Sequence, residues 1–254
     1  TSGDTMSSQL HLCEQSLSTN ALTILNQVRT YPPARKVSNG GGNVIGFLLS
    51  QKMSECKKLW FESIPEKQYA YWLEYDPKVL QFFHQPLKIP LGMDQRGRER
   101  YHIPDFLVFR CHSLTLVEIK PFYGLTSDPE LDLKFEKARQ WSEPLGLQYV
   151  VVTSRDLPDE LFLDNIMFLT RFKNLPDRPR KHTERLLEWI HRQPGISVLE
   201  LVQHFCRVDR KELMPCIWHL IYHQYIRADL QQERLRPGCE KRLSLTISND
   251  RASQ

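Results

Sequence analysis

Two apolar runs stand close together near the middle of the chain, at residues 103–109 and 114–119. Each is rich in Val, Ile, Leu and Phe at consecutive positions, which is typical of strands that are buried on both faces. The short gap between the runs predicts an antiparallel hairpin with Cys111 and His112 in its turn. The sequence therefore predicts a buried hairpin as the centre of a sheet.

A two-residue turn fixes the register of this hairpin. It places Arg110 opposite Ser113, and counting back from that pair places Asp105 opposite Glu118. Opposed residues of an antiparallel pair have Cβ atoms about 5 Å apart. Lys120 follows Glu118 at a spacing of two and shares its face of the strand. A turn one residue longer would shift every pair, so the prediction depends on the turn length.

The remaining apolar segments predict a sheet flanked by helices. We expect, in chain order, a hairpin over 43–61, a helix from 64 to about 75, strands over 79–83 and 87–89, a helix over 131–145, a strand over 147–153 and a helix over 157–172. The helix over 131–145 carries Lys134 and Lys137, which either face solvent or contact a DNA backbone. This order indicates the α/β class with a mixed sheet.

The start of the first of these helices has two interpretations. Ser63 is a good N-cap, Pro65 suits the first turn, and Glu66 occupies the capping-box position. Glu66 would then have a structural role. A metal site beside the sheet would also require a carboxylate here, and the nearby Glu62 and Glu74 compete for that role.

The last third of the chain predicts a small separate domain. Helices are expected over 183–192, 197–206 and 209–224, followed by two strands over 225–230 and 241–246 that pair as a wing. This is the pattern of a winged-helix domain. Arg210 and Lys211 lie near the start of the third helix, where a DNA-reading helix contacts its groove. Winged helices also dock proteins, so DNA contact and partner docking both remain open.

These elements divide the chain into three parts. We expect a flexible N-terminal segment over 1–42 that ends in the glycine run Ser38–Gly42, a sheet domain over 43–172 and a winged-helix domain over 173–254. The glycine run lacks the Lys and Ser/Thr of a phosphate-binding loop. A connector is the better interpretation.

Charge is distributed unevenly between these parts. The chain of 254 residues has a formal net charge of +4. From Arg171 onward there are sixteen Lys and Arg against ten Asp and Glu, so the tail carries +6 and the rest of the chain −2. This asymmetry gives weak support to a polyanion partner for the tail.

The cysteines predict neither a disulfide framework nor a zinc ribbon. They are scattered without a Cys-x-x-Cys pair, at Cys13, Cys56, Cys111, Cys206, Cys216 and Cys239. We expect reduced thiols. Cys216, His219 and His223 have a metal-like spacing, but Trp218 beside them indicates a core-packing helix and ordinary structural roles.

The charged residues of the central hairpin carry the candidate chemistry. Asp105 and Glu118 interrupt apolar runs, and at the predicted spacing their carboxylates would repel each other. A Mg²⁺ or Mn²⁺ ion neutralises such a pair and prefers oxygen ligands. Each feature alone is more often structural: an Asp after Pro starts a strand, and Glu-x-Lys forms a surface salt bridge. Together they predict a metal site, with Pro104 and Pro121 marking where sheet pairing weakens.

The whole pattern resembles the PD-(D/E)xK nuclease superfamily. A helix with Glu, a strand with Pro-Asp and a strand with Glu-x-Lys match it in order at Glu66, Asp105, Glu118 and Lys120. The phrases FESIPEKQYAYWLEYDPKVLQFFHQP, YHIPDFLVF and LVEIKP are similar to TnsA-like endonucleases of heteromeric bacterial transposons. The similarity spans about residues 43–170 and implies a restriction-endonuclease-like fold followed by a small winged-helix domain.

This resemblance implies a site and a reaction. Glu66, Asp105 and Glu118 would bind Mg²⁺, with Mn²⁺ as a substitute, and Lys120 would assist the attacking water. Some relatives carry another polar residue at the position of Glu118. The reaction would be hydrolytic cutting of the non-transferred DNA strand near the 5′ transposon ends.

The resemblance also implies partners. These are the transposon-end DNA, the transposase TnsB and the ATPase regulator TnsC. The absence of a long apolar run and of a secretory pattern favours a cytoplasmic bacterial protein that acts at the nucleoid. The alternatives are a stand-alone restriction or repair nuclease and an inert winged-helix DNA-binding adaptor.

Overall fold

The computed structural model describes residues 2–35, 46–53, 58–122, 128–236 and 243–248. The chain divides into two units, residues 1–157 and 158–254. The sequence placed this boundary at residue 172. The structure instead groups α5 (Glu160–Leu169) with the C-terminal unit, because α5 packs against α9 (Arg210–Tyr222).

A four-stranded mixed sheet forms the centre of the first unit. Its order is β3 (Val79–His84), β6 (Phe106–Arg110), β7 (Ser113–Lys120) and β8 (Gln148–Thr153), and only the β7–β8 pair is parallel. The predicted register is confirmed, because Arg110 pairs with Ser113 across the turn. His112 closes that turn with a φ of 68°. The ladder ends at Phe106 and Val117, one step before Asp105.

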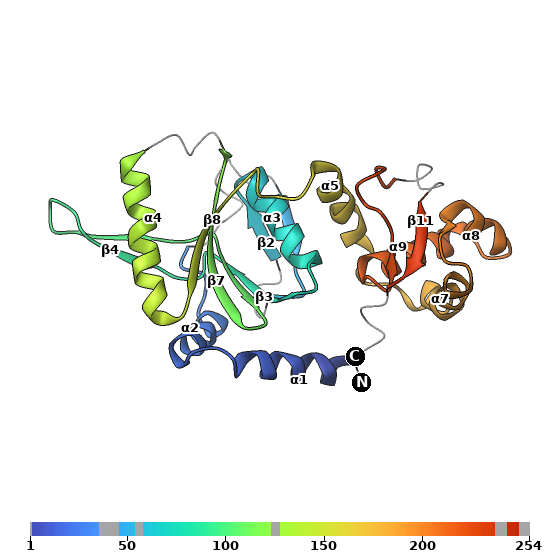
Figure 1. Cartoon of the computed structure of the whole chain (residues 1–254), viewed down its shortest axis with the longest axis horizontal. Coiled ribbons are helices and arrows are strands. Elements are labelled where there is room, and N and C mark those ends of the chain that lie inside the picture. The colour runs from blue at the N-terminus through green and yellow to red at the C-terminus, as the bar shows by residue number, and fades with distance from the viewer. Residues whose placement is uncertain (1, 36–45, 54–57, 123–127, 237–242, 249–254) are drawn as a thin grey trace. The chain divides into compact units, whose positions relative to one another are not determined.

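Alternate residues of β6 enter two separate cores. Phe106 and Val108 pack with α3 (Ile64–Tyr75) and with the hairpin of β1 (Gly46–Leu49) and β2 (Lys58–Phe61). Leu107 and Phe109 pack with α4 (Pro129–Ser142) and with the N-terminal helices. Figure 1 shows α3 and α4 flanking the sheet. The buried apolar residues on both faces explain the continuous apolar runs in the sequence.

The N-terminal segment was expected to be flexible over 1–42, but most of its described residues, 2–35, are helical. It contains α1 (Ser2–Glu14) and α2 (Thr19–Thr30), and the Ser18 hydroxyl caps α2 by accepting the N–H of Ala21. Ala21 and Leu25 are fully buried against the sheet domain. This packing orders the segment. The predicted glycine run Ser38–Gly42 lies outside the described residues.

Cys13 of α1 and Cys111 of the β6–β7 turn form a disulfide with Cα atoms 4.8 Å apart. The expectation of reduced thiols was therefore wrong for this pair. The two residues are 98 positions apart in the sequence, so their spacing along the chain gave no signal. Folding of α1 against the sheet brings them together.

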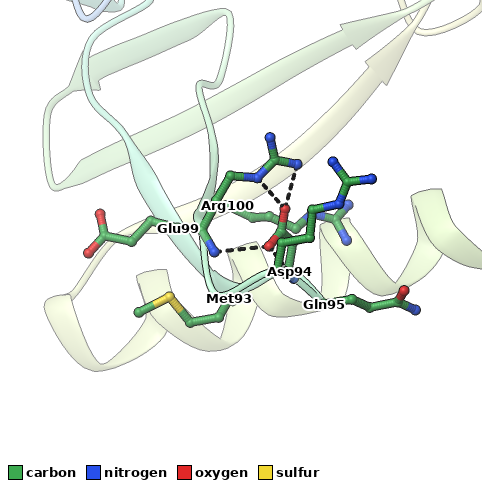
Figure 2. A pocket seen from close by; sticks show the side chains of 7 residues that line it. Met93, Asp94, Gln95, Glu99 and Arg100 are labelled. Carbon is green, nitrogen blue, oxygen red and sulfur yellow. Dashed lines mark hydrogen bonds and ion pairs between the residues drawn. The ribbon is translucent and has the colours of Figure 1, made fainter.

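A second hairpin, β4 (Ile89–Met93) and β5 (Glu99–His102), lies between β3 and β6 in the chain. Its tip holds an open pocket, in which Figure 2 shows Asp94 at the centre and Gln95 and Glu99 pointing away. The Asp94 carboxylate accepts the backbone N–H groups of Arg96 and Arg98 and the Arg98 guanidinium. Both carboxylate oxygens of Asp94 therefore accept hydrogen bonds that stabilise the turn.

The C-terminal unit contains the three helices expected there, α7 (Thr183–Arg192), α8 (Val198–His204) and α9. The short α6 (Asp177–Arg180) precedes them. The strands β10 (Ile226–Arg227) and β11 (Ser244–Ile247) pair antiparallel as predicted, and β9 (Ile196–Ser197) extends this sheet. In the described part of the chain, no helix has both the length and the apolar character needed to cross a membrane.

Candidate active site

Asp105 occupies the end of the central ladder. Its Oδ2 accepts a hydrogen bond of 2.7 Å from the N–H of Ile119 on β7, and its carbonyl accepts one of 2.8 Å from the N–H of Gln85. The residue is thereby fixed between β3 and β7. Burial, then the charge of Glu118 and, more weakly, that of Glu66 raise its pKa to about 7. A cation beside Asp105 would offset this unfavourable environment.

Glu118 is surrounded by cationic and polar groups on the α4 side of the sheet. Its Oε1 lies 2.8 Å from Lys120 Nζ and 3.3 Å from Lys134 Nζ. Burial lowers the pKa of Lys120, but the charges of Glu118, Asp105 and Glu66 outweigh burial and leave that pKa raised. Lys120 therefore remains a cation at the site. Lys134 also points at Glu118, which the sequence did not indicate.

His102 and Tyr149 complete the surroundings of Glu118, and the sequence analysis missed both. His102 Nε2 lies 3.4 Å from Glu118 Oε2 and 2.8 Å from the Tyr149 hydroxyl. Burial lowers the pKa of His102 to about 4 despite the charge of Glu118. His102 is thus neutral near pH 7. The available signal was a histidine set three residues before Asp105 in a strand that ends at the site.

Of the competing acids near α3, Glu66 is the one that interacts with Asp105. Glu62 pairs with Arg35, and Glu74 accepts hydrogen bonds from the Ser50 hydroxyl and the Gln51 N–H. This selection could not be made from the sequence.

Glu66 uses only part of its carboxylate for the helix cap. Ser63 accepts the Glu66 N–H and donates its hydroxyl to Glu66 Oε1 at 2.9 Å, as its predicted N-cap role requires. Glu66 Oε2 is buried and has no hydrogen-bond partner among the described residues. Burial raises the pKa of Glu66. The capping role therefore leaves one oxygen for another ligand.

His84 and Gln85, at the end of β3, were not predicted as site residues. His84 Nε2 lies 4.0 Å from Glu66 Oε2. Gln85 has a φ of 46°, and its Oε1 is buried without a hydrogen-bond partner in the described residues. The sequence signal was a polar pair that ends the apolar strand before Pro86.

The other three predicted residues therefore all interact with Asp105, without forming a finished metal cage. Glu118 and Lys120 are in contact, and both Glu118 and Glu66 change the pKa of Asp105. Glu118 belongs to the α4 side of the sheet, whereas Glu66 comes from α3 on the opposite side. Within the described ranges, no group of three or more His, Cys, Asp or Glu side chains stands ready to hold a metal ion.

An Asp before one strand and Glu-x-Lys on the next, on a mixed sheet flanked by helices, is the arrangement expected of an endonuclease from the resemblance seen in the sequence. The match to a known family is more specific. Residues 76–154 match the family described as the TnsA-like endonuclease N-terminal domain. This segment is similar to that family, so the resemblance seen in the sequence is confirmed. It includes Asp105, Glu118 and Lys120, and Glu66 precedes it. No curated protein matches the chain.

The predicted DNA-contact residues have different surroundings. Lys137 is exposed, and its Nζ donates to the Leu91 carbonyl at 3.1 Å. Arg210 and Lys211 are exposed in the first turn of α9. DNA contact by these residues and by Lys134 stays a prediction.

The metal-like spacing in α9 has a structural explanation. Cys216 Sγ donates to the Pro179 carbonyl, while His219 Nδ1 and His223 Nε2 each lie 2.8 Å from a backbone carbonyl. Burial raises the pKa of the Cys216 thiol to about 11. These contacts agree with the ordinary structural roles expected from the sequence.

Proposed function

We propose that this chain is a divalent-metal-dependent DNA endonuclease of a transposition machinery. It would cut the non-transferred strand near the 5′ transposon ends while a partner transposase processes the 3′ ends. One observation carries the proposal: half-buried Asp105, held by the Ile119 N–H, interacts with Glu118 and Lys120 inside the segment that matches the endonuclease family, and burial and the charge of Glu118 raise its pKa to about 7. Such a carboxylate cluster suits phosphodiester hydrolysis.

The residues present fit Mg²⁺ or Mn²⁺. Asp105 and Glu66 both have raised pKa values, and Glu66 Oε2 is buried without a partner in the described residues. A divalent cation would neutralise both carboxylates and satisfy that oxygen. We assign Glu66, Asp105 and Glu118 as its ligands. When bound, the ion supplies an activated water and stabilises charge on the phosphoryl oxygens.

The chain's own cations would hold the substrate. Lys120, kept protonated by three carboxylates, would orient the attacking water or offset charge on the scissile phosphate. Lys134 contacts the same Glu118 oxygen from α4. Neutral His102, fixed by Tyr149, would hold the other oxygen of Glu118 in place. Each group thus orients a ligand or the phosphate.

We further propose that the C-terminal unit is a winged helix. Three helices followed by paired strands, with β9 between α7 and α8, support this assignment. Arg210 and Lys211 at the start of α9 would contact phosphates if the unit binds DNA. TnsB and TnsC are the proposed protein partners.

The test is nicking of end-labelled transposon-end DNA by the full chain with Mg²⁺, with and without the partner transposase. We expect 5′-end cutting that Asp105→Ala abolishes. Asp132→Ala, which removes an exposed acid of α4, is the matched control and should cut normally. Equal cutting by wild type and Asp105→Ala would overturn the assignment. Strong cutting without any partner would favour a stand-alone nuclease.

A further inference from the structure

Three buried histidines of the described residues stand next to glutamates, and one pair differs from the other two. The nitrogen–oxygen distance is 3.4 Å for His102–Glu118 and 3.3 Å for His182–Glu212. For His84 and Glu66 it is 4.0 Å. A separation of 4.0 Å is too long for a hydrogen bond. Only the first two pairs are therefore in direct contact.

The other contacts of these histidines and glutamates increase the difference between the pairs. His102 Nε2 also contacts the Tyr149 hydroxyl, and Glu212 Oε2 also pairs with Lys181 at 3.5 Å. In contrast, His84 Nε2 and Glu66 Oε2 are both buried without a hydrogen-bond partner in the described part of the chain. An unsatisfied buried polar group costs about 1–3 kcal/mol. A single ligand bound to both atoms, which lie 4.0 Å apart, would satisfy the two groups together.

The spacing of these two atoms suits a metal ion. Opposite ligands of a six-coordinate cation with bonds of about 2.1 Å are about 4.2 Å apart. A water that donates and accepts bonds of about 2.8 Å at a tetrahedral angle would hold its partners about 4.6 Å apart. The observed 4.0 Å is closer to the spacing of metal ligands.

We propose that His84 Nε2 and Glu66 Oε2 are ligands of one divalent cation, which gives the endonuclease site a nitrogen ligand. The side chain of His84 is only 6% exposed, so its ring is held in place by packing. The next residue, Gln85, bonds to the backbone of Asp105, so the cation lies beside the proposed catalytic carboxylate. This inference rests on the proposed function.

The consequence is metal selectivity. Mg²⁺ prefers oxygen ligands, whereas imidazole suits transition metals, and Mn²⁺ binds both kinds of ligand. We therefore expect Mn²⁺ to bind more tightly than Mg²⁺, and His84 to be the cause of the difference. Replacing the ring with an amide should reduce the preference and leave a weaker site made of carboxylates.

Electron paramagnetic resonance of Mn²⁺ bound to the full chain tests the ligand directly, because a coordinated imidazole nitrogen couples to the manganese spin. We expect this coupling in wild type and its loss in His84→Gln. His182→Gln, in the other unit, is the matched control and should retain it. Calorimetry should show Mn²⁺ affinity reduced at least about tenfold in His84→Gln, with Mg²⁺ affinity little changed.

Two results would overturn the inference. One is nitrogen coupling that persists in His84→Gln but disappears in His102→Gln, which would make His102 the ligand. The other is tight Mn²⁺ binding without nitrogen coupling, which leaves the proposed nuclease site intact as an all-oxygen site. Failure of wild type to bind Mn²⁺ at all would reject the proposed function itself. If His84→Gln does not fold, wild type with ¹⁵N-labelled histidine shows whether a histidine is the ligand, and coupling that is retained in His102→Gln and His182→Gln then favours His84.

Discussion

The two units of this chain differ in how many buried side-chain nitrogen and oxygen atoms lack a partner among the described residues. In the C-terminal unit, Asn165 donates to the carbonyls of Leu230 and Glu233 and accepts the N–H of Leu235. Of the described residues there, only Trp189 has a buried side-chain nitrogen or oxygen without a partner. In the N-terminal unit three such atoms occur, on Glu66, His84 and Gln85.

This difference separates polar groups that support a fold from those that await a ligand. The C-terminal polar groups join segments far apart in sequence, so their bonds stabilise the unit. The three unpartnered atoms of the N-terminal unit lie at the start of α3 and around the end of β3, and they make no hydrogen bond among the described residues. A buried polar atom without a hydrogen-bond partner is therefore the better guide to the site. The difference between the two units can be tested by mutation.

The largest effect is expected on cleavage. Asp105→Ala or Lys120→Ala should reduce metal-dependent nicking at least about a hundredfold, because each removes a charge that the proposed function places next to the reacting phosphate. Circular dichroism should show an unchanged fold. Lys211→Ala, in the C-terminal unit, should retain cleavage once DNA is saturating. A cleavage loss in Lys211→Ala as large as that in Asp105→Ala would break the contrast between the units.

The next effect is on the free energy of unfolding, and it should differ between two glutamates. Glu212→Gln should lower the free energy of unfolding by about 1–3 kcal/mol, because Glu212 pairs with His182 and Lys181. Glu66→Gln, measured in a chelator, should leave it unchanged or raise it, since Oε2 has no partner to lose among the described residues. Urea unfolding of both variants gives the comparison. A large destabilisation by Glu66→Gln would show that Glu66 is a structural residue.

A smaller effect follows from the pKa of Asp105. Because its folded pKa is raised to about 7, the folded chain retains a proton that the unfolded chain has already lost. Stability without metal should therefore fall as the pH rises from about 4 to about 7, by roughly 1 kcal/mol per pH unit. Asp105→Asn, which stays neutral and still accepts the Ile119 N–H, should remove this fall. If the stability of the wild type and of Asp105→Asn depended on pH in the same way, the raised pKa of Asp105 would be contradicted.

The smallest effect concerns the C-terminal unit. If α9 contacts phosphates, Arg210→Ala should weaken DNA binding and reduce the slope of log affinity against log salt by about one. Arg192→Ala, an exposed arginine at the end of α7, is the control. Fluorescence anisotropy at several salt concentrations measures both. An unchanged slope in Arg210→Ala would favour partner docking.

The sequence predicted the parts of the fold that depend on local pattern. The turn at Cys111 and His112, the register from Arg110 to Ser113 and the cap at Ser63 follow from short-range rules. Three of the four predicted site residues lie on the central hairpin, so their grouping followed from that register.

The parts that were missed depend on contacts between distant segments. His102 and Tyr149 approach Glu118 only when β5, β7 and β8 are assembled. His84 became a candidate because its burial left a nitrogen unpaired, and burial cannot be read from a single polar residue. The N-terminal helices have weak apolar patterns, and packing against the sheet orders them.

The disulfide of Cys13 affects how a shorter version of this protein should be designed. A chain trimmed to start at residue 43 would lose α1 and α2 and uncover the sheet residues that Ala21 and Leu25 cover. It would also leave Cys111 as a lone thiol, able to crosslink two molecules during purification. Work on the isolated N-terminal unit should retain these helices, or replace Cys111 with serine and the uncovered apolar residues with polar ones.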